Sequence, residues 1–411
     1  FKIHPKAIYM ASAVLFVFSA VPGLPKFPFM TIGLALGFLA YRMEKIREKE
    51  NIAVKEQEIV DQKTTPENLE DLLPLELVEL EVGYGLVELV DADQKGDLLE
   101  RITHLRKQFA LDWGVIIPSI RIIDNLELKP GGYSIKIKGV DVASGELLSD
   151  HFLAMDPGQI IEKIQGIETT EPVFGLPAVW ITEDQKDDAL YNGYTVVDLS
   201  TIMATHITEV LKGNLSELLG REELVKILDN FKEINPKLVG DLIPDILSIG
   251  VVLKVVQNLL REGVSVRDLR SILEALAEHG EKNKEPDTLT ELSRQSLYRT
   301  ITESIKSNQG DVPLFTLDGK VDQLLNESIV QTDHGKQLSL DPQTTQSILA
   351  NLNEKIEEAT NMGEKMVVLC NSNIRSAFKK MTEKFIPNLV VITHNELNPD
   401  INVRSIGTVR L

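Results

Sequence analysis

Cysteine is almost missing from this sequence: Cys370 is the only one among 411 residues. A single cysteine cannot form an internal disulfide, and it cannot build a zinc cluster or a dithiol redox motif. A secreted domain stabilised by internal disulfide bonds is therefore excluded. The bulk of the chain is expected in a reducing, cytoplasmic compartment.

Several motifs of catalysis and metal binding are also missing. The sequence has no glycine-rich Lys-Ser/Thr phosphate loop, no Gly-x-Ser-x-Gly elbow, and no two histidines at the i, i+4 spacing of a metal site. Gly83-Tyr84-Gly85 begins like a dinucleotide fingerprint but lacks the third glycine, so we interpret it as a bulge or a close backbone approach. We predict no catalytic residues, no metal and no cofactor.

Positive charge is scarce, with 43 Lys and Arg against 62 Asp and Glu, a formal charge of −19. Such a chain gains little from binding phosphate backbones. Arg261–Arg270 has the glycine turn of a DNA-reading helix-turn-helix, but acids stand within its second helix. No nucleic-acid partner is expected.

Two stretches near the N-terminus carry no charge, Ala7–Val21 and Phe27–Tyr41. With their apolar flanks, each approaches the ~17–25 residues that a membrane-crossing helix needs. Pro22–Lys26 between them would break a helix. We predict a transmembrane helical hairpin over residues 1–42, rather than a cleaved signal peptide, which has only one apolar region.

Basic residues flank this hairpin on both sides, with Lys2 and Lys6 before it and four more between Arg42 and Lys49, against Lys26 alone at the turn. The positive-inside bias places both ends in the cytoplasm. Because the chain opens at Phe1 rather than Met, we expect it to be the C-terminal piece of a longer membrane protein.

Residues 43–76 read as a polar, acidic linker, too acidic to lie on anionic lipid headgroups. Leu69, Leu72 and Leu73 would share one helix face there. They could dock into a groove on a neighbouring subunit or pack against the chain's own globule.

The remaining length and its periodicity predict several α+β domains. Alternating residues predict strands over Val78–Val82 and Leu86–Val90, followed by a helix over Gly96–Trp113. Ser200-Thr201 would cap a helix over Ile202–Leu219. In the C-terminal region the pattern predicts a βαβ unit, with its second strand over Leu389–Ile392.

These elements predict four subdomains. Their boundaries are 77–149 with 199–219 for a first subdomain, 150–198 for an inserted β-rich subdomain, 220–308 for a helical subdomain and 309–411 for a C-terminal α/β subdomain.

Two features remain as candidate sites. Cys370 ends a predicted strand before a helix, where a thiol could become reactive, although packing is the commoner role of such a residue. Phe174 is flanked by turn-forming residues and could line an interdomain groove, with Thr205 and His206 as a polar rim. Core packing of Phe174 is about as consistent with the sequence.

Seven motifs, in order, resemble the export-gate family of type III secretion, most closely its flagellar members. They are Val82–Leu86, Pro118–Leu126, Phe174–Ile181, Gly193–Asp198, Ala204–His206, Leu218–Arg221 and Val264–Asp268. The resemblance covers the whole chain, including the Pro-Gly-Leu-Pro turn.

This resemblance implies a fold and a set of partners. The expected architecture is the last two transmembrane helices, an acidic linker and four cytoplasmic subdomains, the inserted one small, β-rich and ferredoxin-like. The expected location is the bacterial inner membrane, where nine copies form a ring. The ring would dock flagellar export chaperones with bound substrates and work beside an export ATPase and other membrane proteins of the gate.

The resemblance also assigns residues. A chaperone-binding hollow falls on Glu171, Phe174 and Thr205, with Pro157, Leu176 and Val197 lining it. A subunit-contact role falls on Leu69, Leu72 and Leu73. Two alternatives stay open: an injectisome homologue that exports virulence proteins, and an enzyme that uses Cys370.

Overall fold

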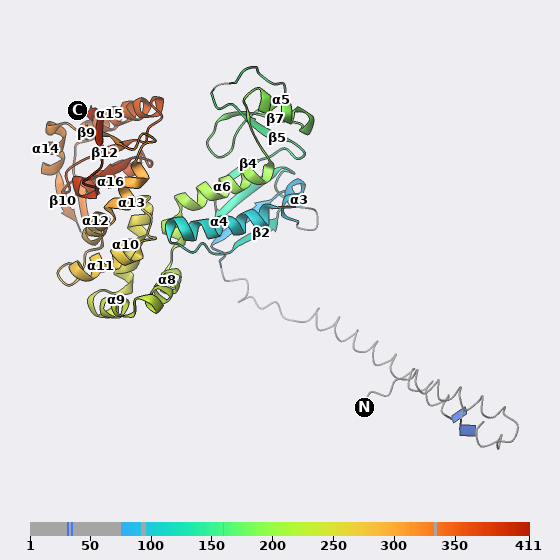
Figure 1. Cartoon of the computed structure of the whole chain (residues 1–411), viewed down its shortest axis with the longest axis horizontal. Coiled ribbons are helices and arrows are strands. Elements are labelled where there is room, and N and C mark those ends of the chain that lie inside the picture. The colour runs from blue at the N-terminus through green and yellow to red at the C-terminus, as the bar shows by residue number, and fades with distance from the viewer. Residues whose placement is uncertain (1–30, 33, 36–74, 92–95, 159, 333–334) are drawn as a thin grey trace. The chain divides into compact units, whose positions relative to one another are not determined.

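The computed structural model describes residues 31–32, 34–35, 75–91, 96–158, 160–332 and 335–411 (Figure 1). The chain divides into two compact units, 1–75 and 76–411. The predicted hairpin and linker belong to the first unit and lie almost wholly outside the described residues. Among the residues that are described, no helix is both long and apolar enough to cross a membrane. The second unit has the predicted mixture of helices and strands.

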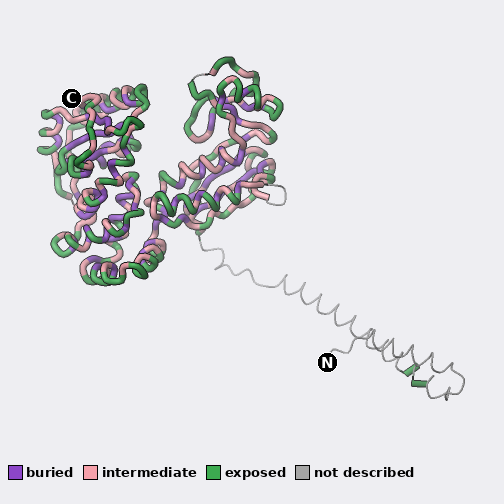
Figure 2. Tube along the Cα trace, in the orientation of Figure 1, coloured by how far each residue is buried: buried purple, intermediate pink, exposed green. Residues whose placement is uncertain are grey.

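The first sheet of this unit has four strands in the order β2-β1-β3-β4. They are β1 (Val78–Val82), β2 (Ile120–Asp124), β3 (Gly132–Ile137) and β4 (Val140–Glu146). Alternate residues of β1 are fully buried, as its sequence predicts. Helices α4 (Leu98–Trp113) and α6 (Leu199–Gly213) pack against each other and bury their apolar sides in the same core (Figures 1 and 2).

The chain after β1 differs from the predicted second strand. Tyr84–Leu86 form a 3-10 turn and Val87–Val90 a short helix, α3. The strand prediction is wrong because Gly83 and Gly85 donate hydrogen bonds to the Gly132 and Pro130 carbonyls at 2.8 and 2.9 Å, which ends the extended backbone there. The close approach is confirmed: a Cβ on Gly83 would lie 2.1 Å from the Lys129 carbonyl oxygen.

The start of α6 also differs from its prediction. The helix begins at Leu199, and its cap is Asp198, whose Oδ1 accepts a hydrogen bond from the Thr201 N–H at 2.6 Å. The predicted cap, Ser200-Thr201, therefore lies inside the first turn, because the carboxylate of Asp198 is an equally good acceptor placed earlier.

A second sheet lies between β4 and α6 in the sequence, in the order β6-β7-β5-β8. Its elements are β5 (Phe152–Met155), β6 (Ile167–Thr170), β7 (Pro177–Ile181), α5 (Lys186–Tyr191) and β8 (Thr195–Val197). Leu153 and Trp180 point into the core that contains the first sheet. Ala154 and Ile181, one residue further along, form a separate small core with Ala189 of α5. Both faces of this inserted sheet are therefore covered.

A helical region follows. It contains α7 (Leu215–Leu218), α8 (Arg221–Ile234), α9 (Pro236–Asp241), α10 (Ile249–Arg261), α11 (Leu269–Gly280), α12 (Pro286–Ser296) and α13 (Tyr298–Ile305). The turn between α10 and α11 contacts α4: the Val266 N–H donates to the Trp113 carbonyl at 3.1 Å and the Ser265 hydroxyl donates to the Asp112 carbonyl at 2.6 Å. The helix-turn-helix pattern therefore serves contacts within the chain.

The C-terminal region holds a parallel sheet in the order β13-β12-β9-β14. Its strands are β9 (Val312–Leu317), β12 (Val367–Leu369), β13 (Val390–Ile392) and β14 (Val403–Val409). The helices are α14 (Gly319–Glu327), α15 (Pro342–Asn361) and α16 (Arg375–Glu383), and β10 (Ile329–Thr332) pairs with β11 (Gly335–Leu338). The predicted βαβ unit is present as β12-α16-β13. The subdomain boundaries themselves stay a prediction.

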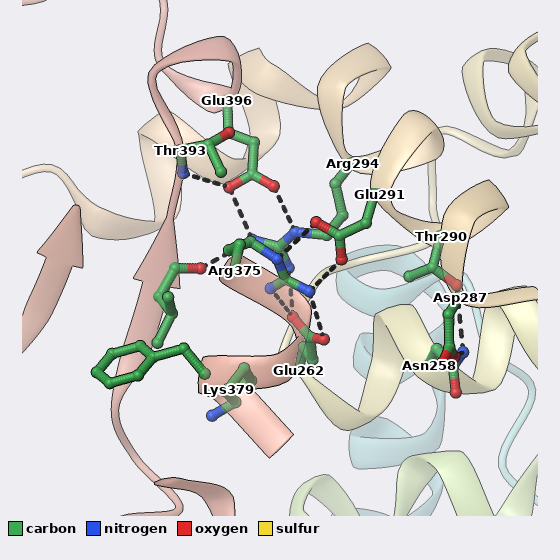
Figure 3. A network of polar contacts seen from close by, with 12 residues as sticks. Asn258, Glu262, Asp287, Thr290, Glu291, Arg294, Arg375, Lys379, Thr393 and Glu396 are labelled. Carbon is green, nitrogen blue, oxygen red and sulfur yellow. Dashed lines mark hydrogen bonds and ion pairs between the residues drawn. The ribbon is translucent and has the colours of Figure 1, made fainter. Parts of the chain in front are cut away.

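A buried ion-pair cluster joins the helical region to the C-terminal sheet (Figure 3). Its members are Glu262, which follows α10, Glu291 and Arg294 of α12, Arg375 of α16, and Glu396, which follows β13. Arg294 donates from Nε to Glu396 Oε1 at 2.6 Å and from Nη1 to Glu262 Oε2 at 2.9 Å. Arg375 donates from Nε to Glu291 Oε2 at 2.7 Å and from Nη2 to Glu262 Oε1 at 2.9 Å.

The cluster fixes how these helices meet. Arg294 and Arg375 are 2% and 0% exposed, so water can solvate neither guanidinium. Breaking such a pair from one side leaves a buried charge without a partner, and the cost is several kcal/mol.

We expect Arg375→Met to leave Glu262 and Glu291 without their shared cation. The free energy of opening for the amides of α12 and α16, measured by native-state hydrogen exchange, should fall by about 3–5 kcal/mol. Arg270→Met is the matched control, because Arg270 forms an exposed ion pair with Glu274 on one helix. If both variants exchange like the parent chain, the cluster does not hold these elements together.

Glu262 should make this part of the chain sensitive to acid, whereas burial raises the pKa of its neighbour Glu291 and partly opposes the effect. Burial would raise the pKa of Glu262, but the guanidiniums of Arg375 and Arg294 outweigh burial and hold the pKa at about 2, below its ordinary value of 4.5. A carboxylate whose pKa is lower in the folded state stabilises that state. This contribution to the free energy of unfolding is fully present above pH 4.5 and is lost as the pH falls towards 2. Urea midpoints should therefore fall steeply in that window. Glu262→Gln should start from a lower midpoint and depend less on pH, and equal slopes would contradict the assignment.

Candidate functional site

The turn between β6 and β7 holds three of the predicted site residues. Glu171 is only 4% exposed, and its carboxylate accepts hydrogen bonds from the N–H groups of Val173 at 2.8 Å and Phe174 at 2.7 Å. The Glu171 N–H donates to the Leu176 carbonyl at 2.8 Å, which closes the turn. Gly175 has a φ of +70°, a conformation that suits glycine. Glu171 therefore shapes the turn from inside.

The same turn presents apolar side chains to solvent. Phe174 is 62% exposed and Leu176 50% exposed. An aromatic side chain held outward on a fixed turn can bury much of its area on binding and loses little backbone entropy when it does so. The geometry suits Phe174 to an anchoring role.

A buried aromatic pair connects β3 to α6. The Tyr133 hydroxyl lies 2.6 Å from His206 Nδ1, and the two rings meet edge to face with centroids 5.7 Å apart. Burial lowers the pKa of His206, while the charge of Glu171 acts in the opposite direction. Burial also raises the pKa of Tyr133, and Glu171 adds to that effect. A neutral His206 can accept a hydrogen bond from the Tyr133 hydroxyl. The charge of Glu171 acts on the pKa of both groups.

His206 was expected in a polar rim, and this prediction is wrong. The side chain is 7% exposed, because its position on α6 points it at Tyr133 of β3 rather than at solvent. Sequence reasoning missed Tyr133 as a contributor. The signal that could have found it is its spacing of two from Ile135 and four from Ile137, because alternate residues of a strand share one face.

Thr205, the neighbour of His206, lines a groove between α4 and α6 with a volume of about 750 Å³. Its hydroxyl donates to the Thr201 carbonyl at 2.7 Å, so its methyl group is free to face the groove. The apolar lining comes from Leu105, Phe109, Trp113 and Ala204. We call this feature the α4–α6 groove.

The other predicted lining residues lie elsewhere on the inserted sheet. Pro157 is exposed in the turn after β5, and Val197 is half-buried on β8, paired with Leu153. The structure thus unites Glu171, Phe174 and Leu176 in one turn and links Glu171 to the residue beside Thr205. It does not place all six residues in one cavity. Leu69, Leu72 and Leu73 lie outside the described residues.

Catalytic and metal chemistry has little support in the described part of the chain, where no group of three or more His, Cys, Asp and Glu side chains could hold a metal ion. Cys370 is 6% exposed, and burial raises the pKa of its thiol above the ordinary value. A raised pKa disfavours the thiolate that nucleophilic catalysis needs.

Comparison with known proteins adds a family and named relatives. The FHIPEP family matches residues 1–402. The flagellar biosynthesis protein FlhA of Bacillus subtilis is 41% identical over 412 aligned residues, which cover 99% of this chain and 60% of that protein. The protein of the same name from Caulobacter vibrioides is 34% identical, with 99% and 58% coverage. The chain thus spans about 60% of the length of these curated relatives.

Solved structures show the same fold. The Chlamydia pneumoniae CdsV protein matches with a TM-score of 0.74 at 24% identity, over 82% of this chain and 98% of that chain. The same protein in complex with CdsO matches with a TM-score of 0.72 at 22% identity, with the same coverage. Nonameric EPEC SctV-C matches with a TM-score of 0.66 at 21% identity, over 82% and 99%.

We expect Glu171→Ala to loosen the β6–β7 turn, because it removes the acceptor of two backbone N–H groups. The amides of Val173 and Phe174 should exchange at least about tenfold faster with deuterium, since a hydrogen bond to a charged group contributes about 1.5–3 kcal/mol. Glu171→Asp keeps a carboxylate at this position and should preserve most of the protection. Glu168→Ala, at an exposed position of β6, is the control. Unchanged exchange in Glu171→Ala would show that the carboxylate does not shape the turn.

Proposed function

Because the chain belongs to the FHIPEP family, we propose that it is the export-gate component of a flagellar type III protein export apparatus, acting as a platform that docks chaperone–substrate complexes. The names of the curated relatives, flagellar biosynthesis proteins, support the flagellar role over the injectisome alternative. The EscV cytosolic domain from the type III secretion system has the same fold, which supports the assignment to type III secretion.

The observation that carries the docking role is the exposed aromatic on a fixed turn. Phe174 is held outward by a turn that the buried Glu171 carboxylate stabilises, and Thr205 lines the groove on the neighbouring helix. In this proposal Phe174 and Leu176 supply apolar anchoring area, and the region around Thr205 receives the adjoining part of the chaperone. Pro157 and Val197 extend the contact on the inserted sheet.

The proposed partners follow from the relatives and from the family. SctV-C is nonameric, and we propose a ring of nine copies for this chain, with the leucines of the linker contacting the neighbouring subunit. CdsV forms a complex with CdsO, which supports a binding role for this fold beside the export ATPase and other gate proteins. The apolar runs of residues 1–42 support an inner-membrane location, with the bulk of the chain in the cytoplasm. The proposed role is not enzymatic and needs no cofactor.

The docking proposal is tested by calorimetry of the 411-residue chain with a flagellar chaperone–substrate complex. Burying one aromatic side chain contributes about 1.5–3 kcal/mol, so Phe174→Ala should weaken binding at least about tenfold. Thr205→Arg should act similarly, because it places a long charged side chain in the α4–α6 groove. Ile234→Ala is the control, since Ile234 is 79% exposed at the end of α8, away from the turn and the groove. Binding that survives both substitutions would reject this site.

A further inference from the structure

A second group of exposed apolar side chains lies on the inserted sheet. Leu190 and Tyr191 end α5 and are 51% and 82% exposed, and Ile161 of the loop between β5 and β6 is 76% exposed. The Ile161 N–H donates to the Asn192 carbonyl at 2.9 Å, so the loop is tied to the end of the helix. We call these three residues the α5 patch.

The α5 patch and the Phe174 turn lie on different elements of the inserted subdomain. Leu153 and Trp180 face the first sheet, whereas Ala154 and Ile181 face Ala189 of α5. Helix α5 therefore covers the face that points away from the first sheet. The Phe174 turn instead joins β6 to β7, and none of its residues belongs to α5 or to the loop that holds Ile161. One partner segment docked at Phe174 would leave the α5 patch uncovered.

Acidic side chains lie along the segment that carries Leu190 and Tyr191. Glu183, Asp184, Asp187 and Asp188 are all exposed. Asp187 precedes Leu190 and Tyr191 by three and four residues, so it shares their side of the helix. Two lysines lie in or near these segments: Lys163, exposed two residues after Ile161, and Lys186, whose ammonium is 4.5 Å from the Phe152 ring centroid. Glu162 stands beside Lys163, so the acids still outnumber the lysines.

The acidic side chains and the apolar patch together indicate what kind of partner can bind. Four carboxylates beside an apolar patch repel anionic lipid headgroups and nucleic-acid phosphates. They attract a polypeptide that carries lysine or arginine next to apolar side chains. The patch has three apolar side chains, so a partner helix can lay one apolar face on them while its basic flanks reach the acids.

We propose that the α5 patch is a second docking surface, which binds a basic amphipathic helix of a partner protein. The apolar contact comes from Ile161, Leu190 and Tyr191, and the acids of residues 183–188 orient the helix and speed its association. This surface is independent of the docking site at Phe174.

The test uses a fluorescent synthetic peptide of about 18 residues, long enough to form a helix, with leucines along one face and lysines on its flanks. The 411-residue chain is held in nanodiscs of phosphatidylcholine, and empty nanodiscs give the blank. Fluorescence anisotropy measures the affinity. A peptide of the same composition, with its leucines distributed around the helix, should bind at least about tenfold more weakly, because its apolar side chains cannot share one face. Equal binding would reduce the interaction to general charge attraction and overturn the proposal.

Variants locate the site. Leu190→Ser with Tyr191→Ser should weaken peptide binding at least about tenfold through lost apolar area. Asp187→Lys with Asp188→Lys should weaken it and flatten its dependence on salt. Glu278→Lys with Glu281→Lys changes the net charge equally at exposed positions near the end of α11 and should have little effect. If this control weakens binding as much as the α5 variants do, the proposed surface is wrong.

Phe174→Ala separates the two proposals. It should weaken the chaperone complex and leave peptide binding intact. If Phe174→Ala instead abolishes peptide binding, the peptide occupies the Phe174 site and the α5 patch is not a second surface.

Discussion

A β-strand sends successive side chains to opposite faces, and in the inserted sheet both faces are apolar. Leu153 and Trp180 must pack against apolar side chains on one face of the sheet, and Ala154 and Ile181 must do so on the other face. The first sheet's core meets the first requirement and α5 with its neighbouring loop meets the second. This double burial fixes where the β6–β7 turn and the end of α5 can lie. Both proposed docking surfaces are therefore consequences of the alternation in two short strands.

The two charged centres of the structure differ in what they stabilise. Glu171 uses one buried carboxylate to hold a local turn, with both hydrogen bonds formed within three residues. The ion-pair cluster instead spans four elements, and its arginines each contact two carboxylates. A buried pair of this kind contributes little net stability over a well-packed apolar core, but it tolerates few alternative arrangements. The turn determines the shape of the surface around Phe174, whereas the cluster determines how the helical region packs against the C-terminal region.

The parts of the fold that the sequence predicted are those with strong local periodicity. The strand at Val78–Val82 and the helix ending at Trp113 each bury a regular set of side chains. The strand over Leu86–Val90 failed because tertiary hydrogen bonds from Gly83 and Gly85 override a short alternation. Strands β9 and β14 were not predicted as individual elements, since the partner that makes each one a strand lies far away in the sequence. For the site, the turn-forming neighbours indicated Phe174 and the resemblance supplied Glu171, but only the structure showed that Glu171 acts inside the turn and that His206 is buried.

The ion-pair cluster also bears on how the chain is made. Glu262 and Arg375 are separated by 113 positions, and Arg294 and Glu396 by 102. A ribosome synthesises Glu262, Glu291 and Arg294 first, and Arg294 can already pair with Glu262. Glu291 has no cation of the cluster until Arg375 emerges, so the helical region cannot bury both carboxylates at low cost during that interval. The final packing of the cluster is therefore completed only when the C-terminal region delivers Arg375 and Glu396.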